Sequence, residues 1–324
     1  MEPERDIGMS APDNSKNITP ASTLPRRTFL EFLAIVPPAL ALSLCSISDV
    51  FGQGHTDADL EYQIESYIKK QRARSAITSD EETSWSIYDF TKSKKLVSIN
   101  EDVPRQAASM IKPFVALAYF YKASEDRKRY PYNSRMQNRM RNMIQHSNNS
   151  ATNQVLDILS NKGRGRGPQE TEAILKAKAP GIFQQTRIVE RIPAEGSTYR
   201  NMASAHDYSR FLFALWQNSF PYSTELKRLM LLPNKDRIYT GARKVPIGTH
   251  VYDKTGTTAR LCGNMGVLIA KGRNGKEYPY SLIGIIEKRT RTNNLTRWIK
   301  SRGNVIREVS NITYAYLQQK HNLI

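Results

Sequence analysis

Ser109-Met110-Ile111-Lys112 opens an apolar, glycine-free segment, residues 109–123, whose pattern predicts a helix that begins near the serine. A serine and a lysine three positions apart share one helical face, so the lysine can lie beside the hydroxyl and take its proton. The start of a helix also presents free backbone amides and the positive end of the helix dipole to a developing anion. The stretch therefore predicts a nucleophile, Ser109, with Lys112 as its base.

A second copy of the pattern, Ser66-Tyr67-Ile68-Lys69, shows that Ser-x-x-Lys alone is not specific. This copy falls in the middle of a predicted helix, residues 57–72, where a solvated helix face is the simplest interpretation. Ser109 differs in its place at a helix start and in two motifs that follow it, Ser147-Asn148-Asn149 and Lys254-Thr255-Gly256. We therefore prefer Ser109 over Ser66 as the nucleophile.

The patterns around this segment predict a mixture of helices and strands. Apolar spacing predicts helices over residues 57–72, 109–123, 134–145, 150–161, 169–178, 203–217 and 294–319. Strands are predicted over residues 85–90, 95–99, 248–253, 263–270 and 278–287, with an Asn274-Gly275 turn before the last. Because strands and helices from both ends bracket a helical middle, we expect a two-lobed α+β fold, with an antiparallel sheet flanked by helices and an all-helical lobe.

The three motifs, in this order and on these elements, resemble the serine β-lactamase and penicillin-binding protein superfamily. Asp253-Lys254-Thr255-Gly256 at the end of a strand and Ser147-x-Asn149 at a helix junction are most similar to the class A β-lactamase branch. The resemblance covers about residues 55–324. It implies a β-lactamase-like fold and a serine hydrolase that forms an acyl-enzyme and needs no cofactor or metal.

The resemblance also implies a role for each motif residue. Ser109 attacks an amide carbonyl and Lys112 takes its proton, provided that burial or a nearby positive charge lowers the pKa of the lysine. Ser147 passes a proton to the leaving nitrogen, and Asn149 holds Lys112 and the substrate amide. An open alternative for Asn149 is that it only caps the following helix.

The remaining implied roles concern the oxyanion and the substrate carboxylate. The backbone amides of Ser109 and Thr257 hold the oxyanion. The substrate carboxylate is bound within the motif that comprises Lys254, Thr255, Gly256 and Thr257, with Arg260 as an additional partner. The alternative for Arg260 is an ordinary surface arginine.

One family feature is absent from the sequence. Class A enzymes carry a Glu-x-x-Leu-Asn segment whose glutamate activates the water that releases the acyl group. Aligning the corresponding region on Arg187 and Pro193 places Ile192 where that glutamate belongs. Glu190 or Glu195 are the alternative bases, against the simpler interpretation of solvated loop carboxylates. The short interval between Ser109 and Ser147 also predicts a more open site.

Composition limits the partners. The 324 residues carry 48 basic and 30 acidic side chains, for a net charge of +18. Such a surface favours anionic partners such as the bacterial envelope. We do not expect nucleic-acid binding, because no zinc cluster, recognition helix or stacking motif accompanies the charge. Only Cys262 remains once a leader containing Cys45 is removed, so neither an internal disulfide nor a cysteine metal site is expected.

The amino terminus predicts export. Arg26-Arg27-Thr28-Phe29-Leu30 precedes an apolar run from Phe32 to Leu44 and resembles a twin-arginine signal. We therefore divide the chain into a leader, residues 1–52, and a hydrolase domain, residues 53–324. The mature protein is expected in the periplasm or outside a bacterial cell, as a monomer without a membrane span.

These observations lead to one main hypothesis and two alternatives. The chain is expected to open β-lactam or D-alanyl-type amide bonds, so its partner is a small β-lactam or a peptidoglycan stem peptide. The alternatives are a penicillin-binding D-Ala-D-Ala carboxypeptidase that releases its acyl group slowly, and a non-catalytic envelope-binding protein on the same fold. An α/β-hydrolase triad is disfavoured, because the sequence contains no Gly-x-Ser-x-Gly.

Overall fold

The computed structural model describes residues 57–160, 166–193 and 199–324. All of them belong to one unit, Gly54–Ile324. The predicted leader, residues 1–52, lies outside the described residues, as does Glu195. Among the residues described, no helix is long and apolar enough to cross a membrane.

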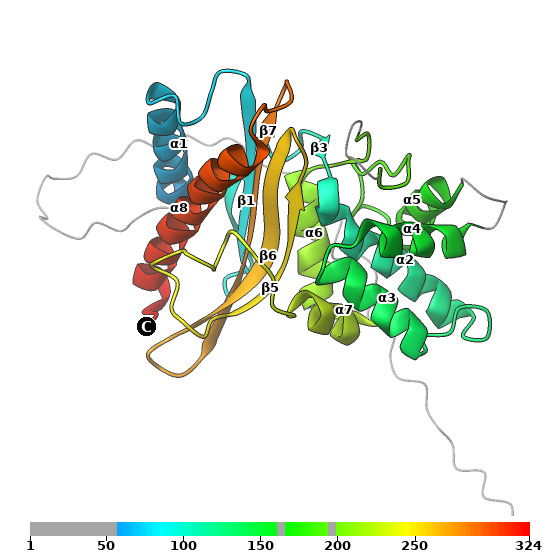
Figure 1. Cartoon of the computed structure of the whole chain (residues 1–324). Helices are drawn as coiled ribbons and strands as arrows, with labels where there is room; N and C mark the ends of the chain where they lie inside the picture. The colour runs from blue at the N-terminus through cyan, green and yellow to red at the C-terminus, as the bar shows by residue number, and fades with distance from the viewer. Residues whose placement is uncertain (1–56, 161–165, 194–198) are drawn as a thin grey trace, which may run out of the picture. The chain divides into compact units, whose positions relative to one another are not determined.

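An antiparallel sheet of five strands forms the centre of the fold (Figure 1). Its strands, in chain order, are β1 (Glu81–Asp89), β2 (Lys94–Ile99), β5 (His250–Thr257), β6 (Leu261–Lys271) and β7 (Glu277–Lys288). They are arranged in the order β2-β1-β7-β6-β5, so β5 is an edge strand. Strands β1 and β7, which are far apart in the chain, pair with each other within the sheet. Every strand predicted from the sequence is confirmed.

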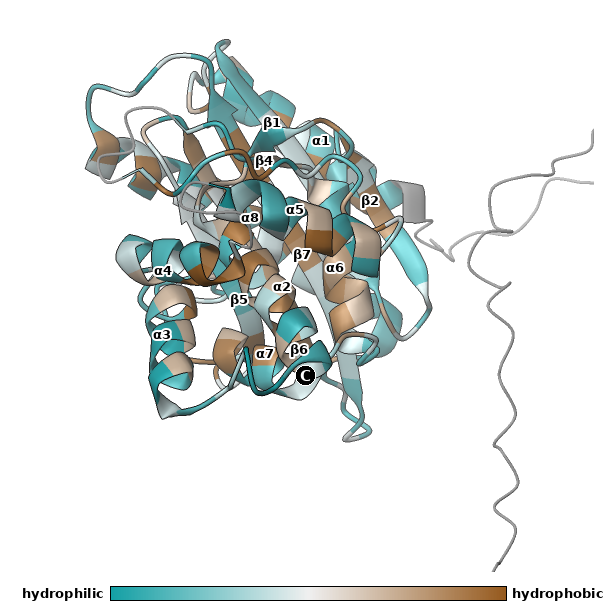
Figure 2. Ribbon diagram, turned by 90° about the vertical axis from the view of Figure 1, so that its right-hand side faces the viewer, coloured by the Kyte–Doolittle hydropathy of each residue, from teal (hydrophilic) through white to brown (hydrophobic). Residues whose placement is uncertain are grey.

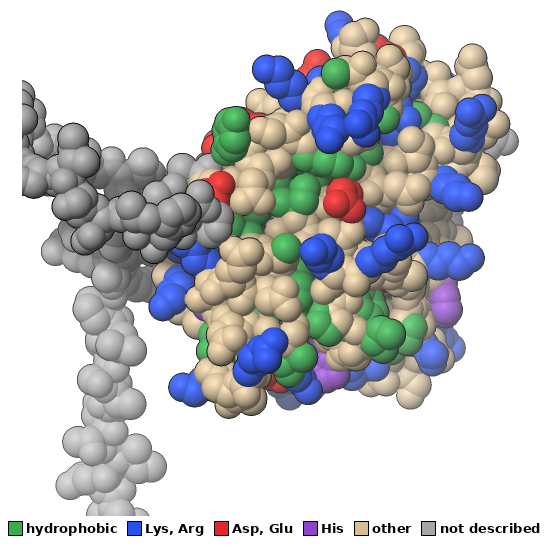
Figure 3. Space-filling view, turned by 90° about the vertical axis from the view of Figure 1, so that its left-hand side faces the viewer, with side chains coloured by type: hydrophobic (Ala, Val, Ile, Leu, Met, Phe, Trp, Pro, Cys, Tyr) green, Lys and Arg blue, Asp and Glu red, His purple; other side chains and the backbone are tan. Residues whose placement is uncertain are grey.

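Two terminal helices, α1 (Asp57–Ala73) and α8 (Leu295–His321), cover one face of this sheet. Their apolar residues pack with the strands around Trp85, which is fully buried. Cys262 is buried in the same layer, where burial raises the pKa of its thiol, so it is a packed residue as expected. Lys and Arg side chains are spread over the outer surface seen from this side (Figure 3).

The other face of the sheet carries the helical lobe. Its helices are α2 (Lys112–Glu125), α3 (Ser134–Ile144), α4 (Asn149–Leu159), α5 (Gly167–Lys178), α6 (Ala205–Trp216) and α7 (Ser223–Met230). Helix α2 is the central one, and all of its residues from Lys112 to Phe120 are buried. Figure 2 shows hydrophobic residues on α6 and on the strands beside it. The predicted α+β architecture is confirmed.

The structure differs from the sequence prediction in four short elements. A 3₁₀ turn, η1 (Ala108–Ile111), precedes α2, so the α-helix itself begins at Lys112 and not at Ser109. Helix α7 was not predicted; its N-cap residue, Tyr222, lacks a capping side chain and has a left-handed backbone. Strands β3 (Arg105–Gln106) and β4 (Met202–Ala203) form a two-residue ladder too short for a sequence signal.

The second Ser-x-x-Lys lies on the α1 side of the sheet. Ser66 is half-buried and Lys69 is exposed, both within α1. Helix α1 packs on β2 and α8, on the face of the sheet opposite the helical lobe (Figure 1), so Ser66 is remote from the other motifs. The preference for Ser109 is consistent with this placement.

Candidate active site

The 3₁₀ turn η1, which carries Ser109, packs closely on strands β5 and β6 of the sheet. Met110 is fully buried, and a Cβ atom built on Gly263 would lie only 2.7 Å from its Cε atom. A Cβ atom on Gly256 would lie 3.0 Å from Met110 Cγ. These two glycines of β5 and β6 therefore allow the nucleophile turn to approach the sheet closely.

The residue before the nucleophile has an unfavourable backbone conformation. Ala108 has φ of 47°, in the left-handed region that costs an alanine on the order of 1 kcal/mol. Its carbonyl accepts a hydrogen bond of 2.6 Å from the buried hydroxyl of Tyr199. This bond holds the turn in place and leaves Ser109 half-buried, lining a cavity.

Lys112 lies fully buried one turn after Ser109. Its Nζ atom donates to Asn149 Oδ1 at 2.8 Å and to Ser147 Oγ at 3.2 Å, and it also contacts the Ser147 carbonyl. Burial, and to a smaller degree the positive charge of Lys254, lower the pKa of Lys112 to about 7. A neutral amine has only two N–H donors and one lone pair, so it can bond to two of these oxygens and still accept a proton from a hydroxyl.

The Ser147-Asn148-Asn149 motif lies between α3 and α4 as predicted. Asn148 is the N-cap of α4, since its side chain accepts a hydrogen bond of 2.8 Å from the amide of Ala151. Asn149, the residue offered above as a possible cap, instead turns its side-chain oxygen to Lys112. Ser147 has φ of 55°, which directs both of its oxygens to Lys112.

The third motif forms the end of edge strand β5. Lys254 is a buried residue of this strand, and burial is the main reason that its pKa falls to about 8. Thr255 is half-buried and Thr257 exposed, and Thr257 lines the same cavity as Ser109 and Asn149. The structure thus brings all three motifs together at one place.

Sequence reasoning missed Arg237. This buried arginine donates from Nη2 to Thr257 Oγ1 at 2.7 Å and from Nη1 to the Gly263 carbonyl at 2.7 Å. Its guanidinium therefore lies behind the third motif and fixes the Thr257 side chain. No local pattern distinguishes Arg237, because its segment belongs to no helix or strand.

The resemblance implies that Arg260 helps to bind the substrate carboxylate, but the Arg260 side chain is directed elsewhere. Its Nε atom donates to the Lys288 carbonyl at 3.0 Å, which ties the turn after β5 to the end of β7. Arg260 is half-buried and does not appear among the described residues that line the cavity. Arg237, and not Arg260, is the arginine in contact with the third motif.

The cavity has a volume of about 260 Å³. Among the described residues it is lined by Ala108, Ser109, Asn149, Ile192, Pro193, Tyr199, Thr257, Thr258, Ala259, Arg291 and Leu295. The apolar Ile192 thus lines the cavity wall, as the alignment predicted. Its amide donates to Asn153 Oδ1 at 2.8 Å, and its carbonyl accepts from Asn153 Nδ2 at 3.0 Å, so α4 fixes its position.

The alternative base Glu190 is engaged elsewhere. Its carboxylate accepts hydrogen bonds of 2.7 Å from the amide and from Nε of Arg200. Glu190 is not among the described residues of the cavity wall. The Glu190 side chain is paired with Arg200 and only 15% exposed, so it is neither a base at the cavity nor the solvated loop carboxylate of the simpler interpretation.

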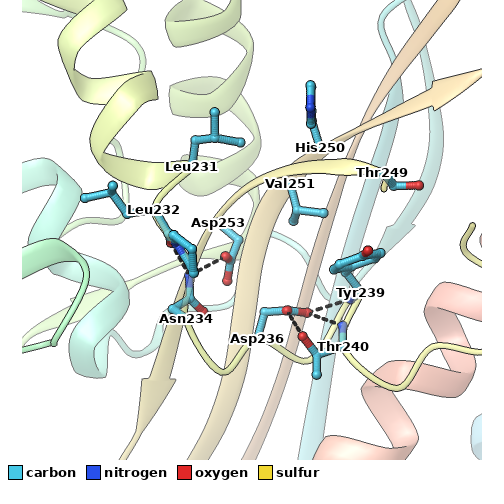
Figure 4. A pocket seen from close by; sticks show the side chains of 11 residues that line it. Leu231, Leu232, Asn234, Asp236, Tyr239, Thr240, Thr249, His250, Val251 and Asp253 are labelled. Atoms are coloured by element: carbon cyan, nitrogen blue, oxygen red, sulfur yellow. Dashed lines mark hydrogen bonds between the residues drawn. The ribbon is translucent and has the colours of Figure 1, made fainter. Parts of the chain in front are cut away.

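A larger hollow of about 450 Å³ lies beside the amino-terminal half of β5 (Figure 4). Two buried carboxylates face it, Asp236 and Asp253, and the pKa of Asp253 is raised to about 6, first by burial and then by Asp236. Both carboxylates accept hydrogen bonds from the chain, Asp253 from Asn234 and Asp236 from Thr240. Because Ser109 does not line it, we assign the chemistry to the smaller cavity.

One group of side chains in the described chain has the composition of a metal site, Glu101, Asp102 and His206. His206 Nδ1 lies 2.7 Å from Asp102 Oδ1, and the Lys95 ammonium lies 2.6 Å from Glu101. The ammonium already neutralises Glu101, so the group is explained by these contacts and joins the β2 turn to α6.

Comparison with known proteins identifies the family. The model of the β-lactamase enzyme family matches residues 66–137 and 128–317. This chain belongs to that family. No curated protein matches the chain. Family and fold together support a hydrolase of the serine β-lactamase type.

Solved structures show the same fold at low identity. A mutant of PBP-A, in an acyl-enzyme complex with penicillin G, shares 18% identity, with 81% of this chain and 97% of that chain covered and a TM-score of 0.62. A β-lactamase from Desulfarculus baarsii shares 16%, with 82% and 99% covered and a TM-score of 0.61. A class A β-lactamase from Bacteroides cellulosilyticus shares 16%, with 81% and 98% covered and a TM-score of 0.62.

Proposed function

We propose that this β-lactamase family member opens β-lactam or D-alanyl-type amide bonds through an acyl-enzyme at Ser109. The observation that carries the proposal is the buried Lys112, whose amine joins Ser147 and Asn149 one helical turn from Ser109. A lysine with a pKa of about 7 is a base at neutral pH, which an ordinary surface lysine is not.

Acylation transfers protons within this group. Ser109 Oγ forms a bond to the amide carbon while its proton passes to the neutral amine of Lys112. The carbonyl oxygen becomes an anion held by the backbone amides of Ser109 and Thr257, each contributing about 3 kcal/mol. The bond from carbon to nitrogen then breaks, and Ser147 delivers a proton from Lys112 to the leaving nitrogen. Lys112 is left neutral again.

The substrate carboxylate is bound at the end of β5. Lys254 supplies the charge, and the hydroxyls of Thr255 and Thr257 supply donors. Arg237 fixes Thr257 by its hydrogen bond and adds a second positive charge behind it. Arg260 takes no part in this proposal, because its side chain is directed to β7.

We propose that release of the acyl group is slow. Among the described residues of this segment, Ile192 cannot activate water and Glu190 is paired with Arg200. This profile favours a penicillin-binding peptidase over a fast β-lactamase, so a D-Ala-D-Ala carboxypeptidase acting on peptidoglycan stem peptides is the second candidate. Peptidoglycan lies outside the cytoplasm, and the basic charge and the twin-arginine-like leader agree with export to an anionic envelope.

Intact-protein mass spectrometry with benzylpenicillin tests the proposal. We expect the mass to rise by one intact penicillin, because the opened ring stays attached through the new ester. Ser109→Ala should abolish this increase, and Ser66→Ala, at the second Ser-x-x-Lys, should leave it unchanged. Absence of any adduct with several β-lactams, together with peptidoglycan binding that survives Ser109→Ala, would establish a non-catalytic envelope-binding protein instead.

A further inference from the structure

The cavity continues beyond Thr257 to the loop between β7 and α8. The chain leaves β5 through Thr258 and Ala259, and the amide of Thr292 donates to the Ala259 carbonyl at 2.9 Å. This bond sets the loop beside the end of the strand. Arg291 and Leu295 consequently line the same cavity as Ser109.

The order of residues along the strand defines which part of a substrate reaches this loop. In the proposed function, on which this inference rests, the carboxylate of the leaving part lies at Lys254 and Thr255, and the reacting carbonyl lies at Ser109 and Thr257. Successive residues of a strand advance by about 3.3 Å, so the positions after Thr257 lie on the other side of the reacting bond. The acyl part of the substrate must extend there.

The walls of this acyl region have a distinct chemistry. Ile192, Pro193 and Leu295 provide apolar surface, and Leu295 keeps 45% of its surface exposed beside the cavity. Arg291 is the only charged residue among the described residues that line the cavity. A guanidinium has five N–H donors in a planar fork, so Arg291 can bond to the chain and still present two donors to a carboxylate.

We propose that Arg291 is a specificity-determining residue that selects substrates whose acyl part carries both an apolar group and a second carboxylate. A substrate of this class has one carboxylate on each side of the reacting amide. The first binds at Lys254 and Thr255, and the second binds at Arg291, while the apolar group packs on Ile192 and Leu295.

Two penicillins that differ by a single carboxylate test this inference. Benzylpenicillin has a neutral acyl side chain, and α-carboxybenzylpenicillin carries one carboxylate on the same carbon skeleton. Acylation rate constants are measured by intact-protein mass spectrometry at low salt. We expect the dicarboxylate to react about tenfold faster, and added salt to reduce this ratio.

Substitutions in the loop connect the preference to one side chain. Arg291→Gln should bring the ratio of the two rate constants close to one, whereas Arg291→Lys should keep part of the preference. Arg289→Gln is the matched control, because this exposed arginine donates to the Ser79 carbonyl and does not line the cavity. In Arg289→Gln, the ratio of the rate constants for the two penicillins should equal that of the wild type.

The outcomes separate the two proposals. The inference is overturned if benzylpenicillin labels the protein and the two penicillins react at similar rates. It is also overturned if the faster reaction of the dicarboxylate survives Arg291→Gln. Both outcomes leave the acyl-enzyme proposal intact. Labelling by neither penicillin overturns the acyl-enzyme proposal and this inference with it. Thermal denaturation of each variant verifies that Arg291→Gln is folded, and Arg291→Lys gives a second reading if it is not.

Discussion

Lys112 Nζ lies 2.8 Å from Asn149 Oδ1, although the two residues belong to different helices. The contact joins the first motif to the second at the amino-terminal ends of α2 and α4. Because the lysine is fully buried, its charged form is disfavoured, and its hydrogen bonds go to the two residues that the resemblance assigns to catalysis.

The first prediction concerns the pH dependence of acylation. Lys112 must be neutral to accept the Ser109 proton, so the rate rises as pH passes about 7. Lys254 must be charged to bind the substrate carboxylate, so the rate falls as pH passes about 8. The second-order rate constant for benzylpenicillin should therefore be bell-shaped, with apparent values that belong to the coupled pair.

Lys254→Arg provides the control for the alkaline limb. Arginine keeps its charge to higher pH, so this limb should move upward while the acidic limb stays in place. The rate constant is measured from about pH 6 to about pH 9, a range that brackets both pKa values. A rate constant that does not change over this range contradicts the assignment of Lys112 as the base.

The second prediction separates two adjacent asparagines. Asn148→Ala removes the cap of α4 and should cost about 1 kcal/mol of stability, seen in the unfolding midpoint, with acylation nearly unchanged. Asn149→Ala removes an acceptor from Lys112 and should slow acylation at least about tenfold. Equal acylation by both variants contradicts a catalytic role for Asn149.

The third prediction concerns release of the acyl group. Ile192→Glu places a carboxylate in the cavity wall that Asn153 holds in position, and it should shorten the lifetime of the penicillin adduct about tenfold or more. Ile192→Gln has a similar shape but no base and should leave the lifetime long. Glu190→Gln should also leave the adduct lifetime unchanged. If the wild-type adduct is short-lived and Glu190→Gln prolongs it, Glu190 is the base and the proposal of slow release is wrong.

The fourth prediction concerns stability. The pKa of Lys112 is lowered from 10.5 to about 7 by folding, so between these values the unfolded chain binds more protons than the folded one. The contribution of Lys112 to the free energy of unfolding should therefore increase with pH, by at most about 1.4 kcal/mol per pH unit. Lys112→Met lacks this dependence.

Denaturant titrations of wild type and Lys112→Met at several pH values measure the difference. Subtraction removes the titrations that both proteins share, that of Asp253 among them. The difference should move in favour of the wild type as pH rises from 7 to 10, and a constant difference would show that Lys112 keeps an ordinary pKa.

The sequence by itself determined the elements and the motifs. Apolar spacing is a local property, so the helices and strands other than α7, β3 and β4 were predictable within a few residues, and the turn at Asn274-Gly275 followed from its residue types. It also provided Ser109, Lys112 and the two downstream motifs as candidates, because the chemistry of acyl transfer restricts which side chains can serve.

Only the tertiary structure decided which side chains meet. Asn148 and Asn149 are equally suited to cap a helix, and the burial of Lys112 determines which one leaves that role. Arg237 and Arg260 are both arginines near the third motif, and only the packing behind β5 turns one of them to Thr257. These contacts join residues far apart in the chain, and their energies depend on burial, which no local pattern encodes.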